Sequence, residues 1–218
     1  ATRMASRMDL MRIAPTVVLD AGCGMSPANR WIGDRYPAAT FIHLDWSRQM
    51  LLRSGRKGGI WSRLSSTWRQ GSEGRLCADL RAIPLADECV DLIWSNLALP
   101  WALPASSAFQ EFTRVLRPGG LLMFSSYGPD TLAELRVAFA ISNLPARVHE
   151  FPDMHDLGDA LVAAGMSAPV MDMEKLTISH ANTQGLLEDL RRAGEVNVLA
   201  YRFRGLTPRY RFRDAISR

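Results

Sequence analysis

The chain lacks the features of a membrane protein or of a disulfide-stabilised secreted domain. No apolar run reaches the roughly 18 residues that a membrane-spanning helix needs, and no basic-then-apolar signal peptide opens the sequence. The 3 cysteines, Cys23, Cys77 and Cys89, are odd in number and lack metal-like spacing. We therefore expect a cytoplasmic protein with no membrane partner, no disulfide framework and no bound metal.

The chain also has no strong excess of one charge, because it contains 26 Lys and Arg residues and 22 Asp and Glu residues. Two segments nevertheless are basic: 47–75 has seven Lys and Arg against Glu73, and 191–218 has eight Arg against Glu195 and Asp214. Such clusters dock nucleic acid, phosphate or an acidic protein, or are solvated faces. No aromatic-basic motif accompanies them, so we expect no nucleic-acid partner.

What is present is the alternation of strand and helix that is typical of a doubly wound, mostly parallel α/β sheet with helices on both faces. The length of 218 residues suits a single domain of this kind. Because the first residue is Ala1, we expect a longer native chain. Apolar runs predict strands over 16–20, 40–45, 75–79, 90–95, 120–127 and 169–179. Helical patterns cover 27–36, 47–54, 106–116, 130–142, 156–164 and 183–193, and 54–75 is expected to be an exposed excursion.

The most informative stretch is 16–26, where a β-branched run ends in Asp20 and breaks into a Gly22-x-Gly24 turn. Glycine accepts a positive φ without steric penalty and lets a ligand approach the backbone. A buried strand that leads into such a turn predicts a nucleotide-type site at its carboxyl end. Ser26 stands where a dinucleotide motif has its third glycine. We interpret Cys23 as a small packing residue.

The second strand also ends in an acidic residue, Asp45, which lies 21 residues beyond Gly24. A carboxylate at this place can accept hydrogen bonds from both hydroxyls of a ribose. Trp46 follows directly and could stack on an adenine or be a half-buried core aromatic.

The third and fourth strands end in polar residues as well. Asp79 could accept from an exocyclic adenine amine while backbone amides at Asp79 and Leu80 read the ring nitrogens. Ser95 and Asn96 end the fourth strand, at the place where the strand order reverses. They could hold an ammonium or a carboxylate there. Asp91 opens the same strand and is interpreted as structural.

These segments together resemble the class I S-adenosylmethionine-dependent methyltransferases. The resemblance covers 16–127, and its blocks are Val18-Leu19-Asp20-Ala21-Gly22-Cys23-Gly24, Leu44-Asp45, Ala78-Asp79-Leu80, Asp91-Leu92-Ile93-Trp94-Ser95-Asn96-Leu97 and Arg114-Val115-Leu116-Arg117-Pro118-Gly119-Gly120. It implies a seven-stranded sheet with one antiparallel strand. It also implies bound S-adenosylmethionine, with S-adenosylhomocysteine as the product, and the ligand roles given above.

The second half resembles the malonyl-acyl-carrier-protein O-methyltransferases of biotin synthesis. Its blocks are Ser95-Asn96-Leu97-Ala98-Leu99-Pro100-Trp101, Gly128-Pro129-Asp130-Thr131-Leu132-Ala133-Glu134-Leu135-Arg136, Phe151-Pro152-Asp153-Met154-His155-Asp156-Leu157-Gly158-Asp159 and Pro169-Val170-Met171-Asp172-Met173-Glu174. This resemblance implies an enzyme that methylates the free carboxylate of a malonyl group on an acidic acyl carrier protein. We expect the protein to be a monomer. The basic segment 191–218 could steer such a carrier in. We expect 16–127 to form the cofactor-binding core and 128–218 to form substrate-side elements and a sheet edge.

No catalytic nucleophile or base is apparent, and a carboxylate acceptor needs neither. A carboxylic acid of pKa about 4 is ionised at neutral pH, so positioning would supply most of the catalysis. Arg136 is our candidate partner for that carboxylate, because arginine binds carboxylates in a bidentate manner; it could equally be a solvated helix residue. Tyr127 and Trp101 could wall the methyl site or be plain core. The cluster around His155 is interpreted as a helix cap.

Three other functions stay open. A mitochondrial assembly factor, thought to hydroxylate an arginine, shares the Asp130-Thr131-Leu132 block and the Gly194-Glu195-Val196-Asn197 block, which would make this chain a cofactor-binding protein without methyl transfer. A nicotinamide dehydrogenase is disfavoured by Ser26. A nucleic-acid methyltransferase is supported only by the basic charge.

Overall fold

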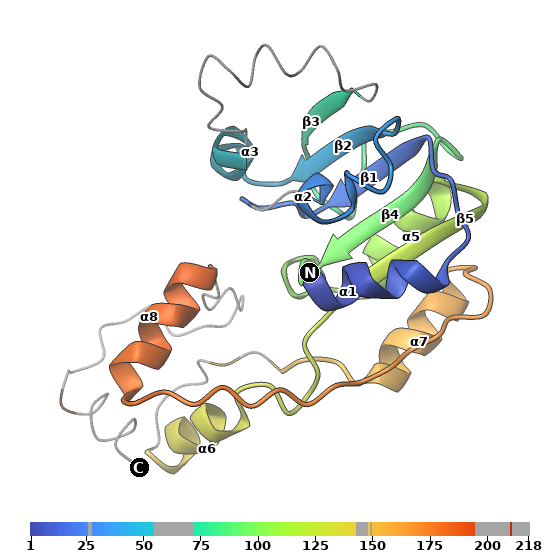
Figure 1. Ribbon diagram of the computed structural model, residues 1–218. Helices are drawn as coiled ribbons and strands as arrows, with labels where there is room; N and C mark the ends of the chain where they lie inside the picture. Colours follow the sequence, from blue (N-terminus) through green and yellow to red (C-terminus); the bar gives the residue numbers. More distant parts are fainter. Residues whose placement is uncertain (26–27, 55–71, 143–147, 149, 195–209, 211–218) are drawn as a thin grey trace, which may run out of the picture. The chain divides into compact units, whose positions relative to one another are not determined.

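A parallel five-stranded sheet is the centre of the structure, a computed structural model that describes residues 1–25, 28–54, 72–142, 148, 150–194 and 210 (Figure 1). The strands are β1 Val17–Ala21, β2 Thr40–Asp45, β3 Glu73–Cys77, β4 Val90–Asn96 and β5 Leu116–Ser125. Their order is β3-β2-β1-β4-β5, and every pair is parallel. The chain therefore winds outward from β1 in both directions, which confirms the doubly wound class.

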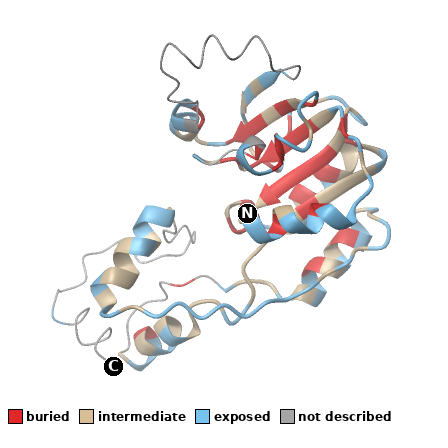
Figure 2. Ribbon diagram, in the orientation of Figure 1, coloured by how far each residue is buried: buried red, intermediate tan, exposed pale blue. Residues whose placement is uncertain are grey.

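Helices cover both faces of this sheet. On one face, α1 Thr2–Arg7, η1 Met8–Leu10 and α2 Asn29–Ile32 contribute to one buried cluster with side chains of β1, β2, β4 and β5 (Figures 1 and 2). On the other face lies α5 Ala105–Val115, whose Phe109 ring meets that of Phe124 edge-on at 5.5 Å. Successive strand residues point to opposite faces, so Met123 and Phe124 serve the two separate cores.

The chain divides into two compact units. The first comprises Ala1–Ser126 and Leu157–Pro169, and the second comprises Tyr127–Asp156 and Val170–Arg218. In the first unit, α3 Arg48–Ser54 follows β2 and η3 Leu99–Trp101 follows β4. The second unit contains α6 Ala133–Ile141 and α8 Thr183–Ala193, and α7 Met154–Ala163 runs from the second unit into the first.

The structure corrects several predicted elements. The strand predicted over 169–179 is wrong: these residues have no regular structure, and Val170 and Ile178 are 94% and 77% exposed. Their apolar pattern fits a strand, but no described segment pairs with it. The described residues supply five of the seven expected strands, all parallel. The helix predicted over 27–36 is reduced to α2, and most of the 54–75 excursion lies outside the described residues.

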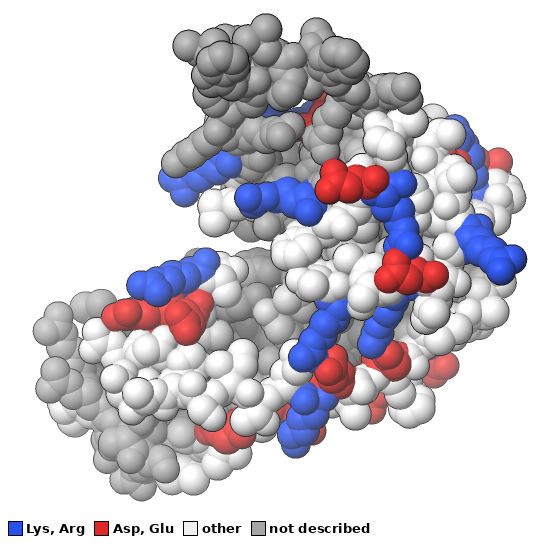
Figure 3. All heavy atoms as spheres, viewed as in Figure 1, with Lys and Arg blue, Asp and Glu red and all other residues white. Residues whose placement is uncertain are grey.

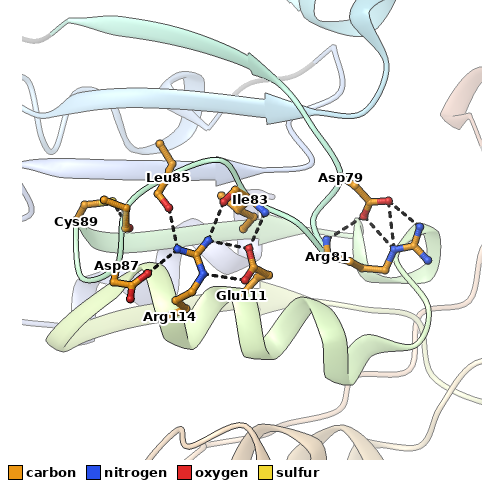
Figure 4. Close-up of polar contacts among 9 residues, drawn as sticks. Asp79, Arg81, Ile83, Leu85, Asp87, Cys89, Glu111 and Arg114 are labelled. Atoms are coloured by element: carbon orange, nitrogen blue, oxygen red, sulfur yellow. Dashed lines mark hydrogen bonds and ion pairs between the residues drawn. The ribbon is translucent and has the colours of Figure 1, made fainter.

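Arg114 on α5 holds the loop between β3 and β4, which carries Asp79 and Leu80 (Figure 4). Its guanidinium donates to both carboxylate oxygens of Glu111 at 2.8 Å, to Asp87 at 2.8 Å, and to the carbonyls of Ile83 and Leu85 at 2.7 and 2.8 Å. These bonds use all five N–H donors of an arginine. The hydrogen bonds that the guanidinium donates to Glu111 and Asp87 raise the pKa of Arg114.

We expect Arg114→Leu to destabilise the protein by about 2–4 kcal/mol, because Glu111 and two carbonyls lose their donors together. Urea unfolding of the full chain measures this change. Arg192→Leu is the matched control, because Arg192 is 78% exposed and its bridge to Asp189 spans 3.8 Å; it should change stability by no more than about 0.5 kcal/mol. Equal effects of the two substitutions would contradict the role given to Arg114.

Asp91 is structural, as its place at the start of β4 predicts. One of its oxygens accepts from the Thr16 amide, the Thr16 hydroxyl and the Val17 amide at 2.8, 2.6 and 2.9 Å, and the other from Arg117 at 2.5 Å. Burial alone would raise the pKa of Asp91, but these hydrogen bonds hold it well below its ordinary value. These hydrogen bonds of Asp91 to Thr16, Val17 and Arg117, which we call the Asp91 clamp, join the amino ends of β1 and β4.

This lowered pKa predicts a loss of stability in acid. The folded protein binds fewer protons at Asp91 than the unfolded chain does, so the stabilisation is present above pH about 4 and is lost as the pH falls further. Urea unfolding at several pH values should show a smaller pH dependence for Asp91→Asn than for the wild type. Asp79 and Glu111, whose pKa values are also lowered, contribute to the slope that remains. An unchanged slope would contradict the clamp.

Candidate functional site

The glycine turn after β1 is fastened to the end of β2. The amides of Gly22 and Cys23 both donate to the carbonyl of Leu44, at 2.8 and 3.0 Å. Gly22 and Gly24 have φ values of 80° and 54°, in the left-handed region that favours glycine. The turn therefore has the conformation that its sequence predicts.

Gly22 and Gly24 serve different needs. A Cβ at Gly22 would lie 2.2 Å from the Cβ of Ala98, so Gly22 is required by close packing against the segment after β4. A Cβ at Gly24 would meet no described residue within 4 Å, so the described part of the chain leaves the space beside Gly24 open. A ligand can therefore approach the backbone at Gly24, while Gly22 joins the ends of β1 and β4.

Asp45 combines a structural role with spare hydrogen-bonding capacity. Its Oδ2 accepts from the Gly24 amide at 2.9 Å, and its Oδ1 accepts from the Ser47 amide at 2.8 Å. A carboxylate accepts about four hydrogen bonds, which leaves room for two hydroxyl groups. Trp46 beside it is 70% exposed. The open backbone, the half-used carboxylate and the exposed ring fit a nucleoside, and the roles predicted for Asp45 and Trp46 stay predictions.

Asp20 holds the far end of the turn from within the core. Its Oδ2 accepts from the Ala28 amide at 2.7 Å and lies 2.9 Å from Nδ1 of His43. Both residues are buried, at 3% and 2% exposure, and burial raises the pKa of Asp20 despite these bonds. Nε2 of His43 has no hydrogen-bond partner within the described part of the chain. The buried Asp20 carboxylate thus anchors the residues that follow the turn to the core through the Ala28 amide.

Cys23 is a packing residue, as predicted. Its side chain is buried, and burial together with the charges of Asp20 and Asp45 raises the pKa of its thiol. A thiol in such surroundings stays protonated and is a poor nucleophile.

Asp79, predicted to read the adenine, is paired with Arg81. The Arg81 guanidinium contacts both carboxylate oxygens at 2.6 to 3.2 Å, and the Arg81 amide donates to Oδ1 at 2.9 Å (Figure 4). These hydrogen bonds lower the pKa of Asp79. Little acceptor capacity remains, so an adenine amine would have to share Asp79 with Arg81. Leu80 is buried near Gly22.

Ser95 and Asn96 end β4 in different environments. Ser95 is fully buried, and its hydroxyl has no hydrogen-bond partner among the described residues. Asn96 is half-buried, and its Oδ1 accepts from the hydroxyl of Ser125 at 3.0 Å. Of these two side chains, Asn96 is the one available to a ligand.

The substrate-side candidates fall into both units. Trp101 is half-buried in η3 of the first unit. In the second unit, the Tyr127 and Phe151 rings pack 5.2 Å apart, and the Arg136 guanidinium donates to the carbonyls of Pro129 and Thr131 at 3.1 and 3.0 Å. Arg136 therefore stabilises its own turn.

The cap predicted around His155 is confirmed. Asp153 precedes α7, and its carboxylate accepts from the backbone amide of His155 at 2.6 Å. This is the usual arrangement for an acidic residue at a helix amino end.

Sequence reasoning missed three residues that contact the predicted site: Ala98 packs on Gly22, Ser125 bonds Asn96, and Arg81 pairs with Asp79. The signal for Ser125 was its place at the end of β5, since parallel strands end at the same edge. Nothing in the pattern distinguishes Ala98 from other small core residues. Among the described residues, no three His, Cys, Asp or Glu side chains form a metal site, and no helix is long and apolar enough to cross a membrane.

The sheet order and the turn at the end of β1 define a class I S-adenosylmethionine-dependent methyltransferase. A family model described as a methyltransferase domain matches residues 19–124. Among solved structures, an S-adenosylmethionine-dependent methyltransferase from Mesorhizobium loti superimposes with a TM-score of 0.53 at 20% identity, covering 76% of this chain and 81% of that one.

Two curated relatives identify the family. A malonyl-[acyl-carrier protein] O-methyltransferase from Gallionella capsiferriformans is 43% identical over 204 residues, which is 94% of this chain and 69% of the relative. One from Laribacter hongkongensis is 44% identical over 207 residues, covering 95% and 69%. The chain belongs to the malonyl-[acyl-carrier protein] O-methyltransferase family.

Proposed function

We propose that the protein transfers a methyl group from S-adenosylmethionine to the free carboxylate of a malonyl group carried by an acyl carrier protein, as a step of biotin synthesis. The observation that carries this proposal is the 43% identity over 94% of the chain, which extends well beyond the cofactor-binding half. The substrate of this proposal is the one that the relatives are named for, a malonyl-[acyl-carrier protein].

The proposed cofactor site uses residues of the first unit. Bound S-adenosylmethionine supplies an electrophilic methyl group on a sulfonium. Asp45 accepts from the ribose hydroxyls, Trp46 lies against the adenine, and the backbone at Gly24 lies against the rest of the nucleoside. These assignments are supported by the spare acceptors of Asp45 and the open space beside Gly24.

No general base is part of the proposal. The malonyl carboxylate is already ionised at neutral pH, so the protein has only to orient it and to exclude water. Arg136 remains the proposed carboxylate partner, with Tyr127 and Trp101 as walls of the methyl site. For Arg136 this requires an N–H beyond the two that hold Pro129 and Thr131.

The proposed carrier surface lies mostly outside the described residues. On the face drawn in Figure 3, many of the basic side chains stand beside acidic ones. Described pairs include Arg35 with Asp9, Arg117 with Asp91 and Lys175 with Asp130. The basic excess of the sequence falls in 47–75 and 191–218, and 191–218 is the segment that we expect to steer the acidic carrier in.

A product assay tests the function. We expect the protein to release S-adenosylhomocysteine with malonyl-loaded carrier and not with acetyl-loaded carrier, which has no free carboxylate. Binding of S-adenosylmethionine without product from either carrier would overturn the proposed reaction. That result would favour the assembly-protein alternative, whose shared Glu195-Val196-Asn197 block lies outside the described residues.

A further inference from the structure

The end of β4 lies where the sheet reverses its order. β4 pairs with β1 through Asp20 and Trp94, and with β5 through Asn96 and Ser125. Two residues after Asn96, Ala98 packs against Gly22 of the glycine turn. Asn96 is therefore beside the proposed cofactor turn.

The backbone at this point is held in an unusual conformation. Leu97 has a φ of 57°, which is uncommon for a residue with a side chain. Its amide donates to both the carbonyl and the hydroxyl of Ser125, at 3.0 and 3.2 Å. Strained backbone that neighbouring groups fix in this way is concentrated at functional sites.

The hydrogen bonds of Ser125 decide how the Asn96 amide is turned. The hydroxyl oxygen of Ser125 accepts from the Leu97 amide, and its single hydrogen is donated to Oδ1 of Asn96 at 3.0 Å. The reverse orientation of the amide would leave that hydrogen without this acceptor. Asn and Gln orientations are assigned from such networks. Nδ2 of Asn96 therefore faces away from Ser125, and no described residue accepts from it.

We propose that Ser125 is a positioning residue that turns the Asn96 amide so that Nδ2 donates to a carboxylate of the bound small molecule. Two N–H donors attract an acceptor oxygen and disfavour an ammonium, which decides between the two groups that the sequence leaves open. The inference rests on the proposed function. It leaves two sources for the carboxylate: the methionine part of the cofactor and the malonyl group.

The experiment compares ligands with and without the carboxylate. Calorimetry measures the binding of S-adenosylmethionine and of its decarboxylated analogue to the wild type, Ser125→Ala, Ser125→Thr, Asn96→Ala and Asn96→Asp. If the cofactor supplies the carboxylate, Ser125→Ala weakens S-adenosylmethionine about 3- to 10-fold and Asn96→Asp weakens it about 30-fold or more. Binding of the decarboxylated analogue stays within about 2-fold of wild type. If the malonyl group supplies it, S-adenosylmethionine binding is unchanged and KM for malonyl-loaded carrier rises by these factors.

Three controls separate positioning from damage to the fold. Ser125→Thr keeps the hydroxyl and should restore most of the affinity. Ser125→Ala added to Asn96→Ala should cause no further loss, because the serine acts through the asparagine. Ser106→Ala, an exposed serine of α5, should change nothing.

Several outcomes would overturn the inference. One is an equal loss of affinity for S-adenosylmethionine and for its decarboxylated analogue. Another is wild-type behaviour of Asn96→Asp in both the binding and the activity assay. The third is an additive loss of affinity in the Ser125→Ala, Asn96→Ala double variant. Failure of the proposed function looks different: the wild type then yields no S-adenosylhomocysteine with malonyl-loaded carrier, while the binding arm still reports on Asn96 and Ser125.

Discussion

Asp45→Ala should weaken S-adenosylmethionine binding about 100-fold or more. The substitution removes the acceptor for two ribose hydroxyls, and hydrogen bonds to a charged group contribute about 1.5–3 kcal/mol each. It also releases the amides of Gly24 and Ser47, so the turn loses its fixed shape. Calorimetric titration of the full chain with S-adenosylmethionine gives the Kd directly.

A graded series makes this test specific. Asp45→Asn keeps one acceptor oxygen and should fall between the wild type and Asp45→Ala. Asp34→Ala removes a carboxylate from an exposed position and should leave the Kd unchanged. Circular dichroism confirms that each variant is folded. A folded Asp45→Ala protein with wild-type affinity would remove Asp45 from the cofactor site.

The parallel sheet could be predicted because the apolar runs in the sequence coincide with the strands that the topology buries. β1, β2 and β4 are apolar runs that are buried on both faces. β2 and β4 end in Asp45 and Asn96, and Asp20 is the next-to-last residue of β1. α8 spans Thr183–Ala193, as its pattern predicts, because Asn182 caps its start and Gly194, with φ of 83°, ends it. In these places the sequence pattern is sufficient.

The prediction fails where an element depends on a distant partner. Residues 169–179 alternate like a strand, yet a strand exists only when another strand bonds to it, and single-sequence periodicity does not reveal that partner. The same limit applies to β5, which begins at Leu116 rather than near 120. A register shift opposite Val90 and Leu92 lets the Pro118-Gly119-Gly120 segment stay in the strand.

The sequence predicts which positions belong to the candidate site, but it does not predict which hydrogen bonds their side chains make. The sequence predicts that Asp45 binds the ribose, and the structure shows that it also fastens the glycine turn. The sequence predicts that Asp79 binds the adenine, and the structure shows that its carboxylate already accepts hydrogen bonds from Arg81. Both contacts depend on side-chain rotamers and loop paths, which spacing along the chain does not determine.

Gly22→Ala should abolish methyl transfer and destabilise the fold. Positive φ costs a residue with a Cβ about 1–2 kcal/mol, and the new methyl group would lie 2.2 Å from the Cβ of Ala98. Either the turn or the segment after β4 must shift, so the positions of Gly24 and Asn96 change together. Urea unfolding and the release of S-adenosylhomocysteine from malonyl-loaded carrier measure the two effects.

A second substitution separates the clash from the backbone strain. Ala98→Gly removes the methyl group that Gly22→Ala would strike, so the double variant should recover part of the lost stability and activity. The part that is not recovered is the cost of positive φ at residue 22, together with the flexibility that a glycine at 98 adds. Gly24→Ala is the matched comparison: φ is positive there too, at 54°, but the added Cβ would meet no atom of the described residues within 4 Å. It should therefore cost less stability than Gly22→Ala while still impeding the cofactor. If Ala98→Gly gave no rescue, the packing of Gly22 against Ala98 would not be what requires glycine at this position.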